Sequence, residues 1–305
     1  METEFVHWLR ERLPPHPRLP LGPGDDGAVL RWGQGCECML TVDLLTDGVD
    51  FELQKTSARK VGRKSLAVNL SDLAAMAARP LGALVALALP RNGALSLAKE
   101  LVEGLIPLAE RFDLPIAGGD TNCWDGPLVV SITLVGEVNA RGPLTRRGAI
   151  PGDKIVVTGQ FGGSILGHHF DFEPRIDEAL LLKSRYELHA GIDVSDGLSL
   201  DLARLAEESG CGAEIQLDRI PVAPAAIALA KQRNDGRLPL EHALGDGEDF
   251  ELILAMPAKT LDELRRQRPL TCELTCVGEF VSQRGLWQLD SQGVRRPLEP
   301  RGFLH

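Results

Sequence analysis

The sequence predicts an α/β (α+β) protein of two domains, each with a mixed sheet flanked by helices. At 305 residues the chain is about twice the size of one typical domain. Segments with strand and helix patterns alternate along it, as in α/β folds. A stretch dense in glycine, proline and arginine, residues 139–153, interrupts this alternation near the middle. We therefore expect an N-terminal domain over residues 1–140 and a C-terminal domain over residues 150–305.

In the N-terminal half, a short amphipathic helix precedes a proline-rich stretch, residues 13–24, which must be irregular. The strongest helix pattern covers residues 56–78, with one apolar stripe at 4-3-4 spacing formed by Leu66, Leu70, Leu73 and Ala77. The other expected elements are a helix at 94–112 and strands at 37–43, 82–90, 114–117 and 128–138.

The C-terminal half repeats the alternation after the linker, which is why we expect a second α/β unit there. Its expected strands lie at 154–159 and near 213–217, 250–256 and 274–280. Its expected helices lie near 162–169, 176–189, 199–208, 223–232 and 259–268.

Composition and charge exclude several classes of function. A net charge of −10 argues against nucleic acid or an anionic membrane as the main partner. No apolar run reaches 18 residues free of charge, and the charged N-terminus does not resemble a signal peptide. The six cysteines show no Cys-x-x-Cys spacing, and no histidine cluster would complete a zinc site. We expect a soluble cytoplasmic protein with reduced thiols.

Short acidic motifs are the most informative feature of the chain. They are GDDGAV (24–29), TVDLLTDGVDF (41–51), NLSDLAAM (69–76), GGDTN (118–122), DVSDGL (193–198) and GDGEDFEL (245–252). If the fold brings them together, like charges a few ångströms apart repel by several kcal/mol at intermediate dielectric. Divalent metal would offset this repulsion, and oxygen ligands suit Mg²⁺, which usually shares its coordination with substrate phosphates. The motifs therefore predict Mg²⁺-assisted phosphoryl transfer from a nucleotide.

The first motif also contains a formal match to the dinucleotide fingerprint G-x-G-x-x-G at residues 22–27. We reject that interpretation because a proline-rich segment, not a strand, precedes it, and two carboxylates would face the phosphate. Asp25 and Asp26 could form a solvated turn. The companion motifs favour metal ligation instead.

The next two motifs place polar groups on regular elements. Asp43 stands at the end of an apolar strand, and Thr41 lies on the same face, offering its hydroxyl or a nearby carbonyl. Asp72 and Asn69 share one face of the helix at 56–78, where inward-facing polar groups are costly unless satisfied. The alternatives are a simple strand-end turn for Asp43 and an exposed helix face for Asp72.

The glycine-rich motifs point to phosphate. In GGDTN, paired glycines would let a phosphate approach the backbone while Asp120 holds a metal, although a plain turn is the alternative. In DVSDGL, Asp193 and Ser195 share one side of an extended segment, and a helix opens near Ser199. The amide end of that helix can neutralise phosphate while Asp193 and Asp196 bind metal. Ser199 is also expected to cap the helix.

The sequence contains no Walker A motif and no protein-kinase signature set, so a kinase of this sequence would hold phosphates through metal and backbone. The ordered motifs, together with KSLAVNLSDLAAM (64–76) and LTRRGAIPGDKIVVTG (144–159), closely resemble the thiamine-monophosphate kinase family. This family belongs to the superfamily of aminoimidazole ribonucleotide synthetase. The resemblance runs from about residue 20 to the C-terminus.

The resemblance implies a two-domain aminoimidazole ribonucleotide synthetase-like fold. The N-terminal domain would bind Mg-ATP and form a homodimer, and the C-terminal domain would close over the site. The implied reaction transfers the γ-phosphoryl group of ATP to thiamine monophosphate, giving thiamine diphosphate, with several Mg²⁺ ions. We expect direct in-line transfer without a phospho-enzyme, because the acceptor phosphate is largely dianionic near neutral pH and needs no strong base.

The resemblance also assigns residues by their place in the motifs. The metal ligands implied are Asp25, Thr41, Val42, Asp43, Asp72, Asp120, Asp193 and Asp196, of which Asp120, Asp193 and Asp196 would be catalytic. The implied ATP contacts are Gly119, Asp120, Arg146 and Ser195. The acceptor end would be formed by Asp50, Glu248 and Phe303.

Three departures from the family pattern all lie at the acceptor end. Val49-Asp50-Phe51 stands where the family usually has Val-His-Phe, and Asp246 alters the usual Gly-Gly-Glu-Asp-Tyr. The chain ends Gly302-Phe303-Leu304-His305, without the final aromatic residue usual in the family.

Two other functions are therefore kept as alternatives: an ATP-using enzyme of the same superfamily with another acceptor, or a non-catalytic nucleotide-binding member. Selenide chemistry would require an early reactive cysteine, yet none precedes Cys36. A hydrogenase-maturation relative would end in cysteine, whereas this chain ends in His305.

Overall fold

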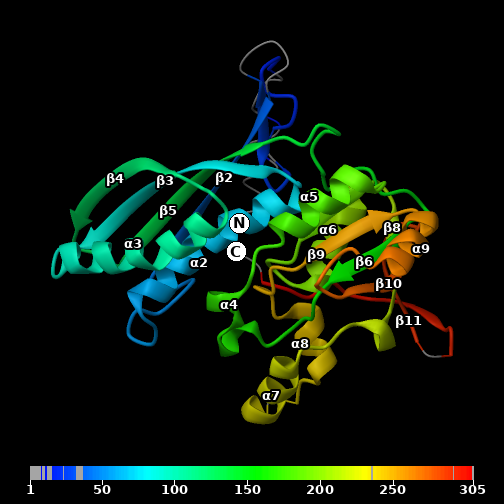
Figure 1. The fold of residues 1–305 in the computed structure, drawn as a ribbon. Coiled ribbons are helices and arrows are strands. Elements are labelled where there is room, and N and C mark those ends of the chain that lie inside the picture. The colour runs from blue at the N-terminus through cyan, green and yellow to red at the C-terminus, as the bar shows by residue number, and fades with distance from the viewer. Residues whose placement is uncertain are drawn as a thin grey trace.

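The structure is a computed structural model that describes residues 8, 11, 16–22, 24–31, 37–234, 236–290 and 292–303. Most of the expected N-terminal helix, Cys36 and the last two residues, Leu304 and His305, fall outside the described residues. Two sheets with flanking helices confirm the predicted fold class (Figure 1). In the described part of the chain, no helix is both long enough and apolar enough to cross a membrane.

The N-terminal sheet has five strands in the order β1-β2-β5-β3-β4, of which only the β3–β4 pair is parallel. Its strands are β1 (Ala28–Arg31), β2 (Glu37–Thr46), β3 (Arg79–Pro90), β4 (Ile116–Trp124) and β5 (Val129–Glu137). Helices α2 (Ala58–Ala75) and α3 (Ala94–Arg111) cover one of its faces, and the other face is open (Figure 1).

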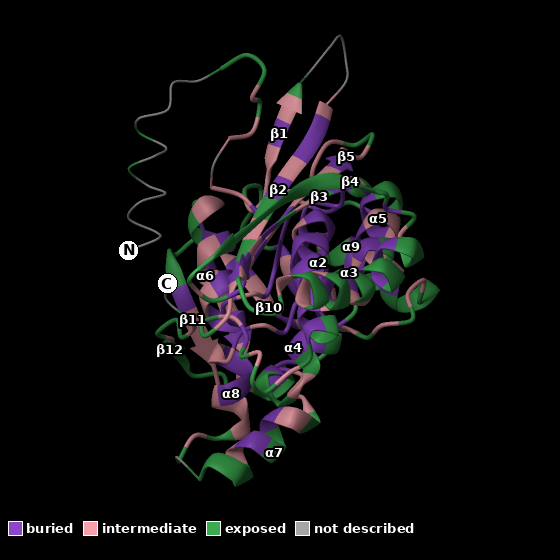
Figure 2. Ribbon diagram, turned by 90° about the vertical axis from the view of Figure 1, so that its left-hand side faces the viewer, coloured by how far each residue is buried: buried purple, intermediate pink, exposed green. Residues whose placement is uncertain are grey.

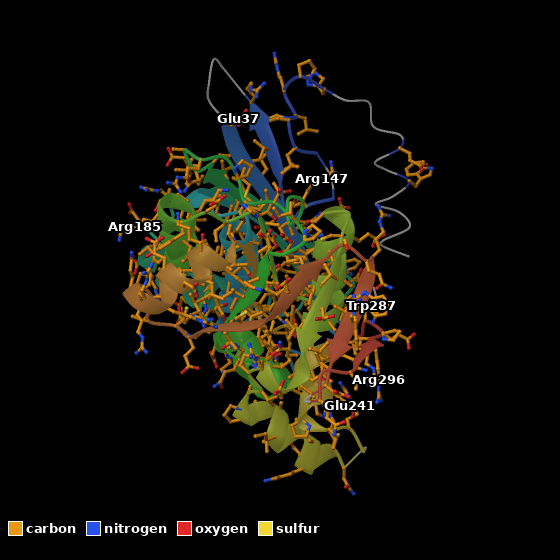
Figure 3. The ribbon with its side chains drawn as sticks, turned by 90° about the vertical axis from the view of Figure 1, so that its right-hand side faces the viewer. Glu37, Arg147, Arg185, Glu241, Trp287 and Arg296 are labelled. Carbon is orange, nitrogen blue, oxygen red and sulfur yellow. The ribbon has the colours of Figure 1, made fainter. Side chains whose placement is uncertain are left out.

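The C-terminal sheet has seven strands in the order β12-β11-β8-β10-β6-β9-β7. Its strands are β6 (Lys154–Thr158), β7 (Ala190–Asp193), β8 (Gly212–Gln216), β9 (Leu252–Met256), β10 (Leu274–Val281), β11 (Gly285–Leu289) and β12 (Arg295–Pro297). The helices of this domain are η1 (Ser164–Leu166), α4 (His168–Asp171), α5 (Ile176–Arg185), α6 (Leu198–Glu208), η2 (Leu217–Arg219), α7 (Pro224–Arg233), α8 (Pro239–Gly245) and α9 (Ala258–Gln267). Trp287 and Arg296 mark the β11–β12 edge (Figure 3).

Helix α2 is the central element of the molecule. Fourteen of its 18 residues are buried, and Leu66, Leu70 and Leu73 of the predicted stripe are fully covered (Figure 2). One face packs on the N-terminal sheet, and other residues of the helix contact α4, α5 and β7 of the C-terminal domain. The largest apolar core is therefore continuous between the domains, because side chains from both belong to it.

Helices α2 and α3 cross at backbone contact distance. A Cβ atom at Gly62 would lie 2.0 Å from the Leu101 carbonyl oxygen, and one at Gly104 would lie 2.0 Å from that of Arg59. Only glycine fits at either position. The two glycines therefore set how closely α2 and α3 pack against each other on the sheet.

The motif GGDTN was expected to follow a short strand at 114–117. It lies within β4, an edge strand whose nine residues are all exposed (Figure 2). The parallel partner β3 extends the strand through the motif, and a Cβ atom at Gly119 would lie 1.7 Å from the Val85 carbonyl oxygen. Close backbone approach to β3 is thus one reason for glycine here.

We predict that Gly104→Ala lowers the free energy of unfolding by about 1 to 3 kcal/mol, because the new methyl group forces the two helices apart. This loss exceeds the gain of about 0.5–1 kcal/mol that alanine brings to a helix. Urea unfolding measures the change. The control is Ser96→Ala at an exposed position of α3, with an expected change within about 0.5 kcal/mol. Equal stability of Gly104→Ala and the unmodified chain would contradict the tight crossing.

Candidate metal and nucleotide site

A cleft of about 1800 Å³ opens between the two domains. Most of the residues that the motifs singled out line it, although they come from distant parts of the chain. From the N-terminal domain they are Asp25, Asp26, Thr41, Val42, Asp43, Val49, Asp50, Lys64 and Asp72. From the linker and the C-terminal domain they include Arg146, Ser164, Asp193, Ser195, Asp196, Arg204, Asp246, Glu248, Phe250 and Phe303.

Three carboxylates converge at the centre of this cleft. Asp26, from the loop before β1, Asp72, from the last turn of α2, and Asp193, at the end of β7, each place one oxygen atom within 4.8 Å of the others. Asp26 and Asp193 are buried. In the part of the chain that the structure describes, this is the group of acidic, histidine or cysteine side chains that could hold a metal ion.

The electrostatics of this cluster favour a bound cation. Burial raises the pKa of Asp72 well above its usual value, and the charges of Asp43 and Asp193 raise it further. Burial, followed by the charge of Asp26, also raises the pKa of Asp193. The pKa of Asp25 rises to about 7, mainly through burial and then through Asp26. A divalent cation would remove both the desolvation cost and the repulsion.

Neutral donors hold the carboxylates in place. The Ser71 hydroxyl donates to Asp193 Oδ2 at 2.5 Å, and the Thr41 hydroxyl donates to Asp72. The main-chain N–H of Asp43 donates to Asn69 Oδ1 at 3.1 Å, which ties β2 to α2. These donors carry no charge, so they orient the acidic groups without neutralising them.

Arg146 supplies positive charge on one side of the cluster. Its guanidinium pairs with Asp26, and its main-chain N–H donates to both oxygens of Asp25, at 3.3 and 3.2 Å. Burial alone would lower the pKa of Arg146, but the neighbouring charge of Asp26 raises it, so the side chain stays charged.

Two polar atoms at this point are left without a partner. Among buried side-chain atoms of the described residues, Asp26 Oδ2 and Arg146 Nε accept or donate no hydrogen bond. An unpartnered carboxylate oxygen beside two further carboxylates fits a hard cation such as Mg²⁺. An unpartnered guanidinium N–H in the same cleft fits a phosphate oxygen.

The DVSDGL loop is held differently from its prediction. Ser199 is not a helix cap: its hydroxyl bonds to the carbonyl oxygens of Leu244 and Arg301, each at 2.9 Å. Asp201 instead accepts from the N–H groups of Asp196 and Gly197, at 2.9 and 3.0 Å. The reason is that α6 begins at Leu198 with Gly197 at its cap position, so Ser199 lies inside the helix, where its hydroxyl binds the C-terminal segment.

Asp196 lies in the cleft beside the cluster but outside it. The Arg204 guanidinium donates to Asp196 Oδ2 at 2.5 Å and to Asp201 Oδ1 at 2.9 Å. Burial, and then the charge of Asp196, raises the pKa of Asp201 to about 7. Arg204 therefore balances two neighbouring carboxylates at this edge of the site.

The residues expected at the acceptor end, Asp50, Glu248 and Phe303, also line the cleft. Lys64 donates to Glu248 Oε1 at 2.5 Å and to the Asp50 carbonyl oxygen at 2.8 Å. The Glu248 main-chain N–H donates to the Ser195 carbonyl oxygen at 2.7 Å. The N–H of Phe303 donates to the Asp196 carbonyl oxygen at 2.9 Å, so the C-terminal segment lies against the DVSDGL loop.

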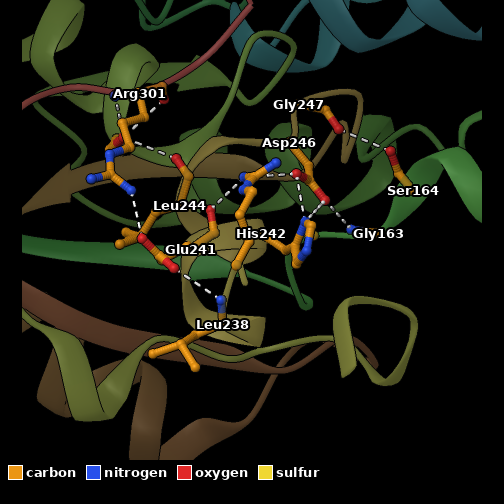
Figure 4. Close-up of polar contacts among 12 residues, drawn as sticks. Gly163, Ser164, Leu238, Glu241, His242, Leu244, Asp246, Gly247 and Arg301 are labelled. Carbon is orange, nitrogen blue, oxygen red and sulfur yellow. Dashed lines mark hydrogen bonds and ion pairs between the residues drawn. The ribbon is translucent and has the colours of Figure 1, made fainter. Parts of the chain in front are cut away.

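Helix α8 and its neighbours fix the segment that carries Glu248 (Figure 4). The His242 ring Nδ1 contacts both carboxylate oxygens of Asp246 at 2.9 Å, and the Gly163 N–H donates to Asp246 Oδ2 at 3.0 Å. The Ser164 hydroxyl donates to the Gly247 carbonyl oxygen at 2.8 Å. These contacts hold Glu248 in a left-handed backbone conformation, with φ of 54°.

Gly119 and Asp120 are the predicted site residues that the structure does not bring to this cleft. Both lie on β4, at the edge of the N-terminal sheet opposite β1, and neither belongs to the residues that line the cleft. Asp120 is exposed, and its Oδ1 accepts the N–H of Thr121 at 2.9 Å. Within a single copy of the chain, Gly119 and Asp120 therefore lie apart from the carboxylate cluster.

Sequence reasoning missed Lys64, Ser71 and Arg204 as functional residues. Ser71 lies within NLSDL, next to Asp72, and a search of that motif for hydrogen-bond donors would have found it. Lys64 opens the longer motif KSLAVNLSDLAAM, but a lysine on a helix is ordinarily exposed. Nothing in the sequence pairs Arg204 with Asp196, because that contact depends on how the loop folds back on α6.

Comparisons with known proteins agree with this architecture. The model of the AIR synthase related protein N-terminal domain matches residues 24–138, and that of the C-terminal domain matches residues 150–282. The thiamine-monophosphate kinase of Rhodopirellula baltica is 41% identical over 312 residues, covering 100% of this chain and 97% of its own. That of Bacillus subtilis is 33% identical and covers 100% of this chain and 99% of its own. The solved structure of AaThiL complexed with AMPPCP and TMP superposes with a TM-score of 0.82 at 26% identity, covering 99% of this chain and 94% of that one.

We predict that Asp72→Asn stabilises the protein in the absence of divalent cations and abolishes stabilisation by Mg-ATP. Removing one buried like charge should raise the free energy of unfolding by about 1 kcal/mol. Mg-ATP at 100 times its Kd should add about 2.7 kcal/mol to the unmodified protein and little to the variant. Thermal unfolding with and without Mg-ATP measures both effects.

The matched control for this test is Asp171→Asn, which neutralises an exposed carboxylate outside the cleft. It should leave stabilisation by Mg-ATP unchanged. Full Mg-ATP stabilisation of Asp72→Asn would show that Asp72 holds no metal.

Proposed function

The chain belongs to the thiamine-monophosphate kinase family of AIR synthase related proteins, and we propose that it transfers the γ-phosphoryl group of ATP to thiamine monophosphate. The product would be thiamine diphosphate. The observation that carries this proposal is the buried cluster of Asp26, Asp72 and Asp193 in a cleft large enough for both substrates. Such a cluster is costly to fold unless a cation and its phosphate ligands occupy the cleft.

Several of the chain's own oxygen atoms would hold Mg²⁺ here. Asp26, Asp72 and Asp193 form the central set, and the surrounding candidates are Asp25, Thr41, Val42, Asp43 and Asp196, all of which line the cleft. When bound, Mg²⁺ would screen the charge of the phosphates and polarise the transferred group. Arg146 and Ser195, which also line the cleft, would contact ATP.

The acceptor requires little acid–base help from the protein. Its phosphate monoester has a second pKa of about 6, so it is largely dianionic near neutral pH and can attack directly. The protein's task is then to hold two anionic groups in line and to neutralise their repulsion. Arg146 remains charged beside the cluster and serves this purpose. Transfer is direct, without a phosphorylated side chain.

The assay that tests this function measures ADP release with Mg-ATP in the presence and absence of thiamine monophosphate. We predict that release depends on the acceptor, that thiamine diphosphate forms in equal amount, and that excess chelator stops both. Acceptor-independent ADP release would favour another acceptor. Nucleotide binding without turnover would favour a non-catalytic member, and a covalent phospho-protein burst would contradict direct transfer.

A homodimer would account for the open face of the N-terminal sheet. Val42, Leu44 and Leu84 are 61%, 63% and 49% exposed on this face, which no helix of the described residues covers. The sheet register places Asp120 on it as well, because Leu44, Ser131, Ala86 and Asp120 are successive neighbours across the strands. A second copy seated here would bury the apolar side chains.

Such a dimer would also explain why Gly119 and Asp120 lie away from the cleft of their own chain. Val42 and Leu44 belong both to the open face and to the lining of the cleft. A second copy packed on this face would therefore carry its own GGDTN motif toward the edge of the first copy's cleft. We propose that Asp120 acts as a metal ligand in the cleft of the other subunit.

Mixing two inactive variants tests this arrangement. Asp120→Asn and Asp193→Asn should each abolish turnover while leaving the fold intact. When the two chains are expressed together, mixed dimers would contain one cleft with every carboxylate intact, and about a quarter of the activity should return. If Asp120 serves its own chain, no activity returns, and a monomer in sedimentation would remove the basis for the proposal.

Asp50 is the residue at which the chain departs from its family at the acceptor end. Its Oδ2 accepts the Thr46 N–H at 2.7 Å, which leaves the negative charge of the side chain without a cationic partner in that contact. We propose that Asp50 faces the positively charged thiazolium ring of the acceptor. A unit charge about 6 Å away contributes on the order of 3 kcal/mol at an effective dielectric of about 20, before screening.

We predict that Asp50→Asn raises the KM for thiamine monophosphate on the order of tenfold and leaves the KM for ATP nearly unchanged. Asparagine keeps an oxygen to accept the Thr46 N–H, so the variant removes charge and little else. Steady-state kinetics with each substrate varied in turn measures the change. Tighter binding of the acceptor to the variant would mean that Asp50 repels its phosphate.

A further inference from the structure

Lys64 is a buried cation on the central helix α2, and it touches both domains. Its side chain is 1% exposed. The ammonium group donates to Glu248 Oε1 at 2.5 Å and to the Asp50 carbonyl oxygen at 2.8 Å. It also lies 5.5 Å from the centre of the Phe170 ring. One charge thus connects the loop after β2, helix α2 and the segment after α8.

Burial of this lysine is not explained by packing. Lysine is rarely fully buried, because its charge must be desolvated, and an apolar side chain of similar length would fill the position at lower cost. The neighbouring Ser65 is also buried, but its hydroxyl donates to the Val61 carbonyl oxygen of the same helix, whereas the Lys64 ammonium group reaches partners outside α2. The contacts of the ammonium group are therefore the reason for lysine.

Those contacts set the geometry of one end of the cleft. Glu248 comes from the C-terminal domain and Asp50 from the N-terminal domain, and both line the cleft. The Glu248 side chain remains 35% exposed, so the ion pair holds it without removing it from the cleft. Lys64 also balances the charge of Glu248, whereas it contacts only the neutral main chain of Asp50.

We propose that Lys64 is a positioning residue for acceptor specificity. It fixes the carboxylate of Glu248 and the backbone of Asp50 at one spacing across the domain boundary. It also neutralises Glu248, so that Asp50 is the carboxylate whose charge faces the cationic ring of the acceptor. This inference rests on the proposed function, because it concerns the acceptor end of the same cleft.

The test compares Lys64→Met with Lys60→Met. Lys60 lies one helical turn earlier on α2 and also bridges the domains, pairing with Asp171 at 3.2 Å, but both side chains are about half exposed. We expect Lys64→Met to raise the KM for thiamine monophosphate at least tenfold, with the KM for ATP changed less than twofold. Lys60→Met should change neither. An equal rise in both KM values would overturn the proposal.

A second set of variants shows whether Lys64 acts through Glu248. The double variant Lys64→Met with Glu248→Gln should have an acceptor KM no higher than that of Lys64→Met alone. Multiplication of the two single effects would mean that the residues act independently and would overturn the proposal. Lys64→Arg, which keeps the charge, should retain an acceptor KM within about threefold if it folds.

Stability measurements separate this inference from the proposed function. Urea unfolding of the unmodified protein, Lys64→Met, Glu248→Gln and the double variant gives the coupling free energy between Lys64 and Glu248 without any substrate. If the unmodified protein forms no thiamine diphosphate, the proposed function fails, while the unfolding cycle still reports on the pair. Absence of coupling in the unfolding cycle would overturn the positioning role even in an active enzyme.

Discussion

The burial of α2 between the two domains is the constraint on which the rest of the structure depends. The helix is covered on one side by the N-terminal sheet and on another by α4, α5 and β7, and Gly62 and Gly104 hold α3 against it at backbone distance. On its enclosed faces the helix offers little solvent to polar side chains, whereas Arg59 and Lys60 near its start stay exposed. Lys64, Asn69 and Asp72 must therefore find partners within the cleft, and those partners come from both domains.

In one chain, the negative charge of the carboxylates that line this cleft is only partly balanced by positive charge. Neutral donors such as Ser71 and Thr41 orient the carboxylates, but Arg146 is the cation placed directly against Asp26. The raised pKa values of Asp72 and Asp193 express the same imbalance, because burial and mutual repulsion both disfavour their charged forms. Metal and nucleotide binding would relieve an arrangement that folding alone leaves strained. If these three carboxylates hold the metal as proposed, stability and ligand affinity are coupled through them.

Much of this site was predictable because a short acidic motif indicates possible metal or phosphate binding even when its three-dimensional surroundings are unknown. The sequence predicted Asp72 and Asp193 as metal ligands, and both lie in the carboxylate cluster, since each stands beside a turn or on a helix face that limits where its side chain points. The resemblance assigned Asp25 and not Asp26 as a metal ligand, whereas Asp26 belongs to the cluster, because the direction of a loop residue depends on contacts such as the Arg146 pair. GGDTN was expected to follow a short strand rather than to extend it, because its pairing with β3 is a long-range contact. The short elements α8, β11 and β12 were missed, since their patterns span too few residues to be read.

Two acidic residues that depart from the family pattern, Asp246 and Asp50, differ in whether a cation balances their charge. Asp246 and Asp50 both place an acidic side chain where the family pattern has none, yet they differ in their partners. Asp246 contacts His242 at 2.9 Å and the Arg237 guanidinium at 3.0 Å, so its charge is balanced within the C-terminal domain. The carboxylate of Asp50 accepts a main-chain N–H, which orients it and leaves its charge in place. Lys64 meanwhile balances Glu248. Asp50 therefore keeps its charge beside the proposed acceptor position, and a cationic ring there would complement it.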